Sequence, residues 1–394
     1  MGKKKLAYID YWTHQYTRSG DFLREILSEE FEITDFWWKE KKKIPLDKIN
    51  EFEYIFFFHV MFPHQIMKKL SKKKIMWAPM YDALNFKNSF FKSIFWKQIS
   101  NLGIKVLKFS DKITESIEKE DVDSLKLNYF IKPNFHSLIE KQTKLNIFFW
   151  DRGRIKVNDW LRLFDKNKIN EIVYLPRPDP GMKIINNNNL IKTKINFKFI
   201  DKKYLPKNEY LSIFKKCNVF IAPRKKEGIG ITIVEALSKG MFIVGYNDST
   251  MNEYIKDKQI GFIFDEKTED KINIKNIIGN YKHRKKYAEK NYNKWIQDKK
   301  KIIPLLKKEN KIIKKTKKKL SFKFKYELEN LPIEIQNLQL EINGINNELK
   351  NSNLYLDNIE KFNKITGQMY ELKETLANKE NRWLTLSEMN ENLE

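Results

Sequence analysis

The chain reads EGIGITIVEALSKG at residues 227–240, between the apolar runs NVFIAP at 218–223 and MFIVG at 241–245. Both runs are short, rich in β-branched and aromatic residues, and bounded by Pro or Gly, which is typical of buried parallel strands. Residues 231–239 have room for about two and a half turns of helix. The stretch therefore predicts a strand, a glycine loop, a helix and a second strand.

The glycine loop combines two residues that have no side chain with two flanking carboxylates. Gly228 and Gly230 lack a Cβ atom, so backbone N–H groups can approach a ligand closely, and the start of the following helix favours phosphate. Glu227 lies at the mouth of this loop, and Glu235 lies one turn inside the helix. A carboxylate is repelled by phosphate but accepts hydrogen bonds from the hydroxyls of a sugar or ribose. The loop is therefore expected to hold a diphosphate joined to sugars.

The spacing E-x7-E, with G-x-G inside it and E-A-x-x-x-G at its end, resembles the donor-site signature of retaining glycosyltransferases with the GT-B fold, the family 4 group. The resemblance implies that Glu227 contacts the hydroxyls of the donor sugar and Glu235 the ribose. It implies that the other donor-binding positions are Gly228, Gly230, Ile231 and Thr232. It also implies a nucleoside-diphosphate sugar as donor, retention of configuration, and no metal or cofactor. A plain strand–loop–helix turn with two solvated glutamates is the alternative.

Composition limits the class of protein and its surroundings. Of 394 residues, 41% are hydrophobic and 28 are Phe, so packed cores are expected. The formal charge of +25 indicates an anionic partner: nucleic acid, acidic phospholipid or a phosphorylated substrate. The single cysteine, Cys217, cannot form an internal disulfide, which favours the reducing cytoplasm. No apolar stretch reaches about 18 residues, so contact with the inner membrane face would be peripheral.

Strands and helices alternate along the first 298 residues. In the first half, strands are expected at 6–10, 31–38, 54–59, 75–79, 105–109 and 128–131, with helices near 64–71, 88–101 and 111–119. In the second half, strands are expected at 145–150, 172–175, 197–200 and 260–264, with helices at 208–216, 249–256 and 283–295. This alternation predicts an α/β chain of two Rossmann-like domains in the GT-B arrangement, at 1–133 and 134–298.

Acceptor contacts are expected in the first domain, beyond the carboxyl ends of its strands. The loops 11–20, 59–64 and 80–82 follow these ends, and they contain the candidates Ser19, His59 and Tyr81. Members of the resembling family often carry a His-Asp pair after the fourth strand, where this chain has Tyr81-Asp82. Asp82 would then keep its catalytic role, while the role of the histidine falls to His59, His64, Tyr81 or to no residue. His59 is equally open to interpretation as a cap of a buried strand, and His14 is expected at the surface.

A basic loop follows the first strand of the second domain. It contains Arg152, Arg154 and Lys156. In the resembling family an Arg at this strand end and a Lys a few residues later neutralise the donor diphosphate as charge develops on it. Guanidinium and ammonium groups suit phosphate oxygens by charge and by their number of donors. Either arginine could pair with Lys156, and a basic loop without function is the alternative.

The amino-acid composition of the chain changes at Lys299. Residues 299–325 contain thirteen lysines and one acidic residue, Glu309, which predicts a solvated basic linker. Beyond it, apolar residues recur at spacings of four and three, at 331, 335, 338, 342, 345 and 349, and again at 362, 365, 369, 372 and 376, with Trp383 and Leu386 in phase. The polar break at 351–353 between these seams predicts an antiparallel coiled-coil hairpin over residues 326–394.

The tail also resembles a known domain. The segments KKLSFK at 318–323, YELENLP at 326–332, LY at 354–355 and RWLTL at 382–386 resemble the C-terminal coiled-coil domain of Uup-type ABC-F ATPases, which is associated with nucleic-acid binding. The phosphate-binding loop of such ATPases, G-x-x-x-x-G-K-[ST], is absent from the chain.

Two functions are therefore expected. The first is a glycosyltransferase that moves a sugar from a nucleoside-diphosphate sugar to a glycan or lipid-linked acceptor, in the synthesis of bacterial surface polysaccharide or lipopolysaccharide. The second is a protein associated with nucleic acid or the ribosome, which acts through residues 299–394 and carries an inactive GT-B body. A third interpretation treats the tail as a fused dimerisation element. Partner candidates are the donor, the acceptor, anionic membrane, nucleic acid and another coiled coil.

Overall fold

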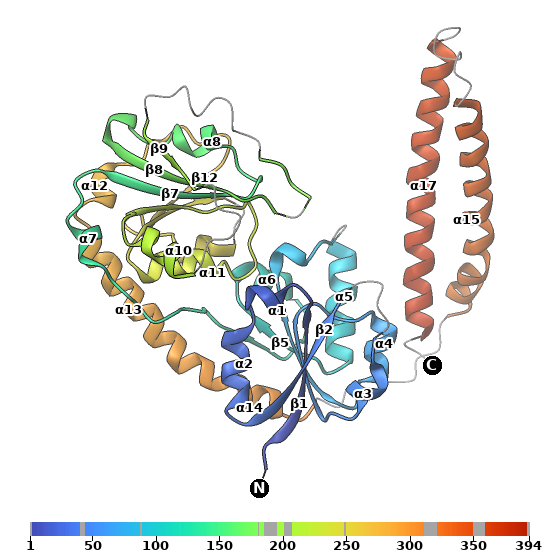
Figure 1. Ribbon diagram of the computed structural model, residues 1–394. Helices are drawn as coiled ribbons and strands as arrows, with labels where there is room; N and C mark the ends of the chain where they lie inside the picture. The colour runs from blue at the N-terminus through green and yellow to red at the C-terminus, as the bar shows by residue number, and fades with distance from the viewer. Residues whose placement is uncertain are drawn as a thin grey trace. The chain divides into compact units, whose positions relative to one another are not determined.

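A computed structural model describes residues 2–39, 44–86, 89–117, 119–179, 181–184, 195–200, 207–247, 250–310, 321–349 and 359–391. The chain divides into two compact units, residues 1–311 and 312–394, which are described separately. The first unit holds both predicted Rossmann-like domains, and the second is the helical tail (Figure 1).

The first domain is built on a parallel sheet of six strands in the order β2-β1-β3-β4-β5-β6. The strands are β1 (Lys4–Tyr11), β2 (Phe31–Trp38), β3 (Tyr54–His59), β4 (Lys74–Pro79), β5 (Lys105–Lys108) and β6 (Ser124–Lys126). The helices are α1 (His14–Thr17), α2 (Asp21–Ser28), α3 (Leu46–Asn50), α4 (His64–Lys69), η1 (Tyr81–Ala83), α5 (Ser89–Asn101) and α6 (Asp111–Ile117). The order reverses between β1 and β3, which is where such sheets bind ligands.

Alternate residues of the central strands fill two cores. Tyr8, Phe56 and Phe58 face α2, whereas Ile55 and Phe57 face α3 to α6. All these side chains are almost fully buried because helices cover both faces of the sheet. This double burial is the physical reason for the continuous apolar run in β3.

The second domain repeats this plan with the strand order β12-β11-β10-β7-β8-β9, again all parallel. The strands are β7 (Leu145–Asp151), β8 (Ile169–Pro176), β9 (Phe197–Phe199), β10 (Val219–Ile221), β11 (Phe242–Tyr246) and β12 (Gly261–Phe264). The helices are α7 (Ser137–Glu140), α8 (Val157–Leu161), η2 (Lys166–Lys168), α10 (Lys207–Phe214), α11 (Ile231–Ser238), η3 (Thr250–Tyr254), α12 (Ile274–Ile277) and α13 (Tyr281–Asp298). Two parallel sheets of six strands confirm the predicted α/β class.

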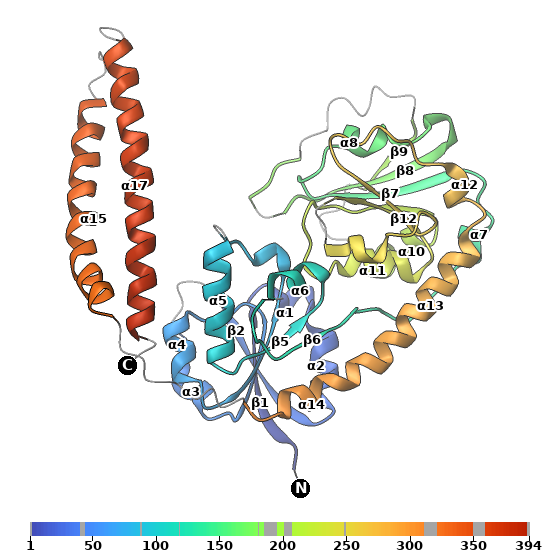
Figure 2. The ribbon, with the colours of Figure 1, turned by 180° about the vertical axis from the view of Figure 1, so that it is seen from behind.

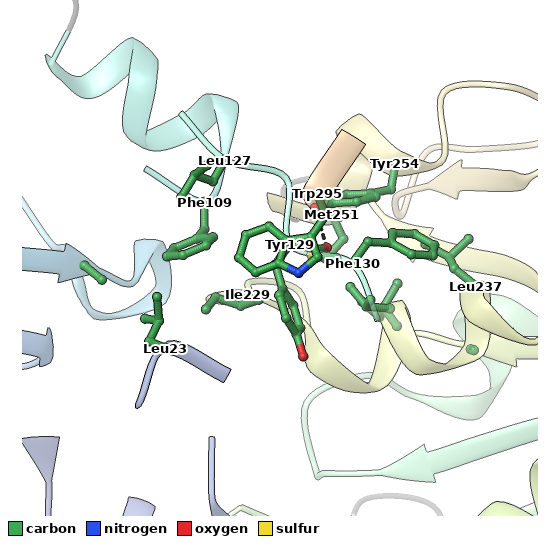
Figure 3. Close-up of a cluster of buried hydrophobic side chains, with 14 of the residues drawn as sticks. Leu23, Phe109, Leu127, Tyr129, Phe130, Ile229, Leu237, Met251, Tyr254 and Trp295 are labelled. Carbon is green, nitrogen blue, oxygen red and sulfur yellow. Dashed lines mark hydrogen bonds between the residues drawn. The ribbon is translucent and has the colours of Figure 1, made fainter. Parts of the chain in front are cut away.

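A shared apolar core joins the two domains. Figure 3 shows Leu23, Phe109 and Tyr129 of the first domain in one cluster with residues of the second and with Trp295 of α13. The Trp295 ring centroid lies 5.2 Å from that of Tyr129. The Tyr254 hydroxyl donates a hydrogen bond of 3.0 Å to the Tyr129 carbonyl within this cluster. Packing of this kind fixes the two sheets against each other.

The long helix α13 carries the chain back to the first domain (Figures 1 and 2). After it come η4 (Lys299–Lys301) and α14 (Ile302–Lys307). Helix α14 packs against β4 and β5, and its residues Ile302, Ile303 and Leu306 are buried. This start of the expected solvated linker is therefore part of the globular unit. In the sequence, the high lysine content hid the helical spacing of these three apolar residues. Residues 311–320 of the linker lie outside the described part of the chain.

One expected strand is also displaced. The sixth strand is β6 at Ser124–Lys126, and residues 128–131 have no regular secondary structure. Tyr129 and Phe130 are apolar because they belong to the core shared by the two domains. Their hydrophobicity thus reflects a buried crossing between domains and not a strand.

The second unit is an antiparallel pair of helices, α15 (Phe322–Leu349) and α17 (Ile359–Glu391). Leu331 and Ile342 of the first seam and Ile365 and Leu386 of the second are buried. Arg382 and Glu327 form a two-pronged ion pair of 2.6 and 2.7 Å between the helices. The hairpin is confirmed, although the predicted break at 351–353 lies outside the described residues. Trp383, which was expected in the seam, is 36% exposed.

None of the helices in the described ranges is both long enough and apolar enough to cross a bilayer.

Candidate functional site

Most of the predicted site residues line one cavity of about 210 Å³ within the globular unit. It lies beyond the carboxyl ends of β1, β3 and β4 in the first domain and of β7 and β10 in the second. The lining residues are His14, Ser19, Phe58, His59, Met80, Asp82, Arg152, Pro223, Arg224, Glu227, Gly228, Ile229, Gly230, Ile231 and Thr232. The cavity thus brings together groups from both domains.

The glycine loop lies tightly against its surroundings. Gly230 is the residue before α11 and has φ +61°, a conformation that glycine adopts without steric cost. A Cβ atom there would lie 2.6 Å from Cγ of Met251. A Cβ atom on Gly228 would lie 3.0 Å from Sδ of Met80 and 3.1 Å from Oδ1 of Asp82. Glycine is therefore required at Gly230, whereas a side chain at Gly228 would have to displace the side chains of Met80 and Asp82. The first turn of α11 opens onto the cavity, which Ile231 and Thr232 line.

Glu227 is a buried acid at the edge of the cavity. It is 6% exposed, and its Oε1 atom has no hydrogen-bond partner among the described residues. Nη1 of Arg224 lies 3.7 Å from the other carboxyl oxygen, Oε2. Burial raises the pKa of Glu227 to about 7, Arg224 opposes this change, and Asp82 adds to it. A buried oxygen without a partner is costly, so this atom is a ready acceptor for a hydroxyl of a ligand.

Three arginines surround Asp179. Its carboxylate accepts from Nε of Arg152 at 2.7 Å and from Nε of Arg154 at 3.3 Å. Arg224 donates to both oxygens, at 2.6 and 2.9 Å. Burial alone would raise the pKa of Asp179, but Arg224 and Arg152 overcome this and lower it to about 2. The acid is therefore ionised and holds the guanidinium groups in fixed positions.

Of the three basic residues that the sequence grouped, Arg152, Arg154 and Lys156, the first alone is among the described residues that line the cavity. Arg152 lines the cavity, whereas Arg154 is exposed at 46% of its side chain and is absent from the lining. Lys156 is exposed and precedes α8, also away from the lining residues. Sequence reasoning missed Arg224, although its position just after β10 is a carboxyl end where ligands bind. It also missed Asp179, for which the loop offers no local signal.

A second pair missed by the sequence analysis is Asp10 and His14. Asp10 is fully buried at the end of β1, where its carboxylate lies 2.5 Å from Nδ1 of His14 and 2.9 Å from Nη2 of Arg24. The His14 side chain is only 13% exposed and lines the cavity, so the expectation of a surface histidine is wrong. In the sequence, this pair was indicated by the spacing of four residues between Asp10 and His14 at the end of a predicted strand.

His59 lies beside His14, with 5.4 Å between the ring centroids. Burial lowers the pKa of His59, while the nearby Asp82 carboxylate opposes the change. Asp82 and Ser19 also line the cavity, but Tyr81 does not. The Tyr81 ring is instead 5.6 Å from the ammonium group of Lys226.

Glu235 is half-buried on α11 and is not among the lining residues of the cavity. Burial, followed by the Glu235 carboxylate, raises the pKa of Tyr210 and of Tyr129. Glu235 therefore lies on the side of α11 that faces these two tyrosines.

Comparison with known proteins identifies two parts of the chain. Residues 189–294, which include the glycine loop and α11, match the family model described as glycosyl transferases group 1. The second domain is a group 1 glycosyltransferase domain. Residues 319–388 match the model of the ABC transporter C-terminal domain, which covers the helical hairpin. No match was found among curated proteins.

Solved structures confirm the GT-B fold of the glycosyltransferase unit. Sucrose-phosphate synthase from Thermosynechococcus elongatus is 9% identical, with a TM-score of 0.52 over 77% of this chain and 98% of that one. HepE from Anabaena, solved with UDP and glucose, is 10% identical, with a TM-score of 0.51 over 77% and 99%. WaaG, a glycosyltransferase involved in lipopolysaccharide biosynthesis, is 12% identical, with a TM-score of 0.51 over 77% and 100%. At these identities the likeness is one of fold.

Proposed function

We propose that the glycosyltransferase unit takes a sugar from a nucleoside-diphosphate sugar and transfers it to an acceptor hydroxyl in the 210 Å³ cavity. The observation that carries the proposal is the unpartnered Oε1 of Glu227, buried beside the glycine loop and Arg224. A carboxylate oxygen accepts from sugar hydroxyls, while the helix start and the arginines attract a diphosphate. Few other ligands carry both groups in one molecule.

In the proposed donor complex, the diphosphate lies at the first turn of α11, near Ile231 and Thr232, and beside Arg152 and Arg224. These cations need little reorganisation because Asp179 already holds them. Gly228 and Gly230 let the diphosphate approach the backbone, and Glu235 is assigned to the ribose. Arg154 and Lys156 would reach the phosphates only after movement of their exposed side chains, so Arg152 is the preferred partner.

We assign the chemistry as transfer with retention and without a metal ion. The bond between the anomeric carbon and the diphosphate oxygen breaks, and the acceptor oxygen bonds to the same face of that carbon. The acceptor proton passes to the departing diphosphate oxygen. Positive charge fixed next to that oxygen lowers the barrier. His14, His59, Asp82 and Ser19 line the opposite wall and are assigned to the acceptor; Tyr81 would reach it only by rotating away from Lys226.

The assigned acceptor is a bacterial surface polysaccharide or lipopolysaccharide precursor, modified in the cytoplasm at the inner membrane face. Support comes from the GT-B relationship to WaaG, whose own role is in lipopolysaccharide biosynthesis. HepE, solved with UDP and glucose, makes uridine donors the first to test.

A thermal-shift screen tests the donor proposal. The full chain is heated with UDP-, GDP-, ADP- or CMP-sugars, alongside Glu235→Ala and the control Glu289→Ala, an exposed glutamate of α13. A donor at 100 times its dissociation constant stabilises by about 2.7 kcal/mol. One donor class should raise the melting temperature of wild type and control but not of Glu235→Ala. Absence of a shift with every donor would contradict the proposal.

The hairpin supports a second candidate function, binding to nucleic acid, because residues 319–388 match the ABC transporter C-terminal domain and follow a lysine-rich segment. Phosphate neutralisation by lysines makes affinity fall steeply with salt. We expect the full chain to bind RNA or duplex DNA more tightly at 50 mM than at 200 mM salt. A truncated chain ending at residue 311 should lose this binding. Equal binding by both chains would refute the assignment.

A further inference from the structure

A second cavity, of about 730 Å³, lies wholly in the first domain. Its walls come from the ends of β1 to β4 and from α4, η1 and α5. Aromatic side chains make up much of the lining: Tyr11, Trp38, Phe62, Trp77 and Phe95. This volume is within the range of sites for small molecules.

The lining contrasts with the rest of the chain in charge. Charged residues make up 32% of the sequence, yet no Lys, Arg, Asp or Glu is among the described residues that line this cavity. The histidines His59 and His64 and the amide of Gln98 are its main polar groups. Water in such a space has few hydrogen-bond partners, so an apolar ligand that displaces it binds favourably.

His59 belongs to both cavities. Its φ of +65° lies in the left-handed region, which a residue with a side chain rarely adopts. The Val60 N–H donates to the Phe58 carbonyl at 2.7 Å and closes a three-residue turn centred on His59. The indole of Trp77 donates to the His59 carbonyl at 3.4 Å. A strained turn held in this way at the junction of two cavities indicates a functional position.

From the larger cavity to the smaller one, the lining therefore changes from apolar side chains, past His59, to the polar residues of the acceptor wall and Glu227. A molecule with a hydrocarbon chain at one end and a sugar at the other matches this change, with its chain in the larger cavity and its sugar in the smaller one. We propose that the 730 Å³ cavity binds the alkyl or prenyl chain of an amphipathic acceptor, whose hydroxylated end passes His59 into the smaller cavity. This inference rests on the proposed glycosyltransferase function and names its acceptor class.

Binding of a fluorescent hydrophobic probe to the full chain tests the inference. N-phenyl-1-naphthylamine should become brighter with the protein, and n-alkyl β-D-glucosides should displace it below their micelle concentrations. Each added methylene should tighten displacement by about fourfold until the cavity is full. Methyl glucoside should not displace the probe at the same concentrations. Displacement that is independent of chain length would overturn the proposal.

Variants locate the binding. Gln98→Glu places a charge in the apolar wall, and Lys97→Gln, at the exposed neighbouring position on α5, makes the same one-unit change in net charge. Ala83→Trp, at an exposed lining position, obstructs the cavity without disturbing a buried core. Gln98→Glu and Ala83→Trp should weaken probe binding at least tenfold, and Lys97→Gln should not. Equal binding by all three would place the probe elsewhere and overturn the inference.

The thermal shift with a nucleotide sugar is measured on the same variants. It should persist in Gln98→Glu and Ala83→Trp, because neither residue lines the smaller cavity. A persistent donor shift without chain-dependent displacement rejects the hydrocarbon site alone. Chain-dependent displacement without any donor shift in wild type rejects the glycosyltransferase proposal and, with it, the acceptor assignment.

Discussion

The buried carboxyl group of Glu227 should make the unliganded protein less stable as pH rises. Its pKa is about 7 in the folded chain, against an ordinary value of 4.5. Between these values the unfolded chain releases the proton and the folded chain keeps it, so each rise in pH favours unfolding. The full difference corresponds to about 3 kcal/mol.

The variant Glu227→Gln removes this ionisation and preserves the shape of the side chain. Relative to wild type, we expect it to be more stable by about 1 kcal/mol at pH 5 and by about 3 kcal/mol at pH 8. Urea denaturation followed by tryptophan fluorescence measures both values, without donor present. The same variant should lose transferase activity at pH 8, where the wild-type carboxyl group is ionised, since a neutral amide is a weaker acceptor for sugar hydroxyls than a carboxylate.

The pH dependence distinguishes the loss of an ionisable group from a change in side-chain packing, because packing does not vary with pH in this way. Glu289→Gln, at an exposed position, should have the wild-type stability at both pH values. If Glu227→Gln changed stability equally at pH 5 and pH 8, the carboxyl group would not be held in its neutral form by burial, and the reasoning would be refuted.

Three further outcomes follow from the contacts described. In a transfer assay, Arg224→Ala should lower kcat by about 10²- to 10³-fold, because it removes a fixed hydrogen-bond donor to a charged transition state. Lys156→Ala, at an exposed position, should lower kcat by less than about tenfold in the same assay. His14→Asn should lower kcat/KM for the acceptor and leave the donor-induced thermal shift unchanged; loss of that shift would instead place His14 at the donor. In the hairpin, Leu386→Ala should cost about 2–4 kcal/mol of unfolding free energy, whereas Trp383→Ala, at a 36% exposed position, should cost under about 2 kcal/mol, and equal losses would contradict the seam.

The local pattern predicted much of the donor side. The glycine loop, the helix after it and the flanking strands are consecutive in sequence, so their spacing alone fixes their order. Gly230 with φ +61° before α11 is the outcome that such a loop requires. The heptad seam was predictable for the same reason, because its period is local.

The acceptor side and the arginine cluster depend on contacts distant in sequence. Asp179 meets Arg152 and Arg224 only because β7, β8 and β10 end at the same edge of one sheet. No periodicity marks such a meeting. The pairing of Asp10 with His14 is local, but its importance appears only when β1 and β3 are adjacent and His59 lies beside it.

After residue 298 the high lysine content of the chain conceals a buried apolar segment. Ile302, Ile303 and Leu306 are buried, yet the surrounding lysines gave the segment the composition of a solvated arm. A long lysine side chain can lie along apolar surface with its charge in water, so composition averaged over 27 residues conceals three buried positions.

The return of α14 to the first domain has a consequence for synthesis on the ribosome. The first sheet lacks part of its cover until Ile302, Ile303 and Leu306 have been added, although its last strand ends at Lys126. At usual rates of translation the interval is on the order of ten to thirty seconds. During that time the second domain can complete its own sheet. The first domain, although it is synthesised first, is therefore completed last. A nascent chain stalled before residue 300 should therefore expose the first sheet to chaperones and proteases.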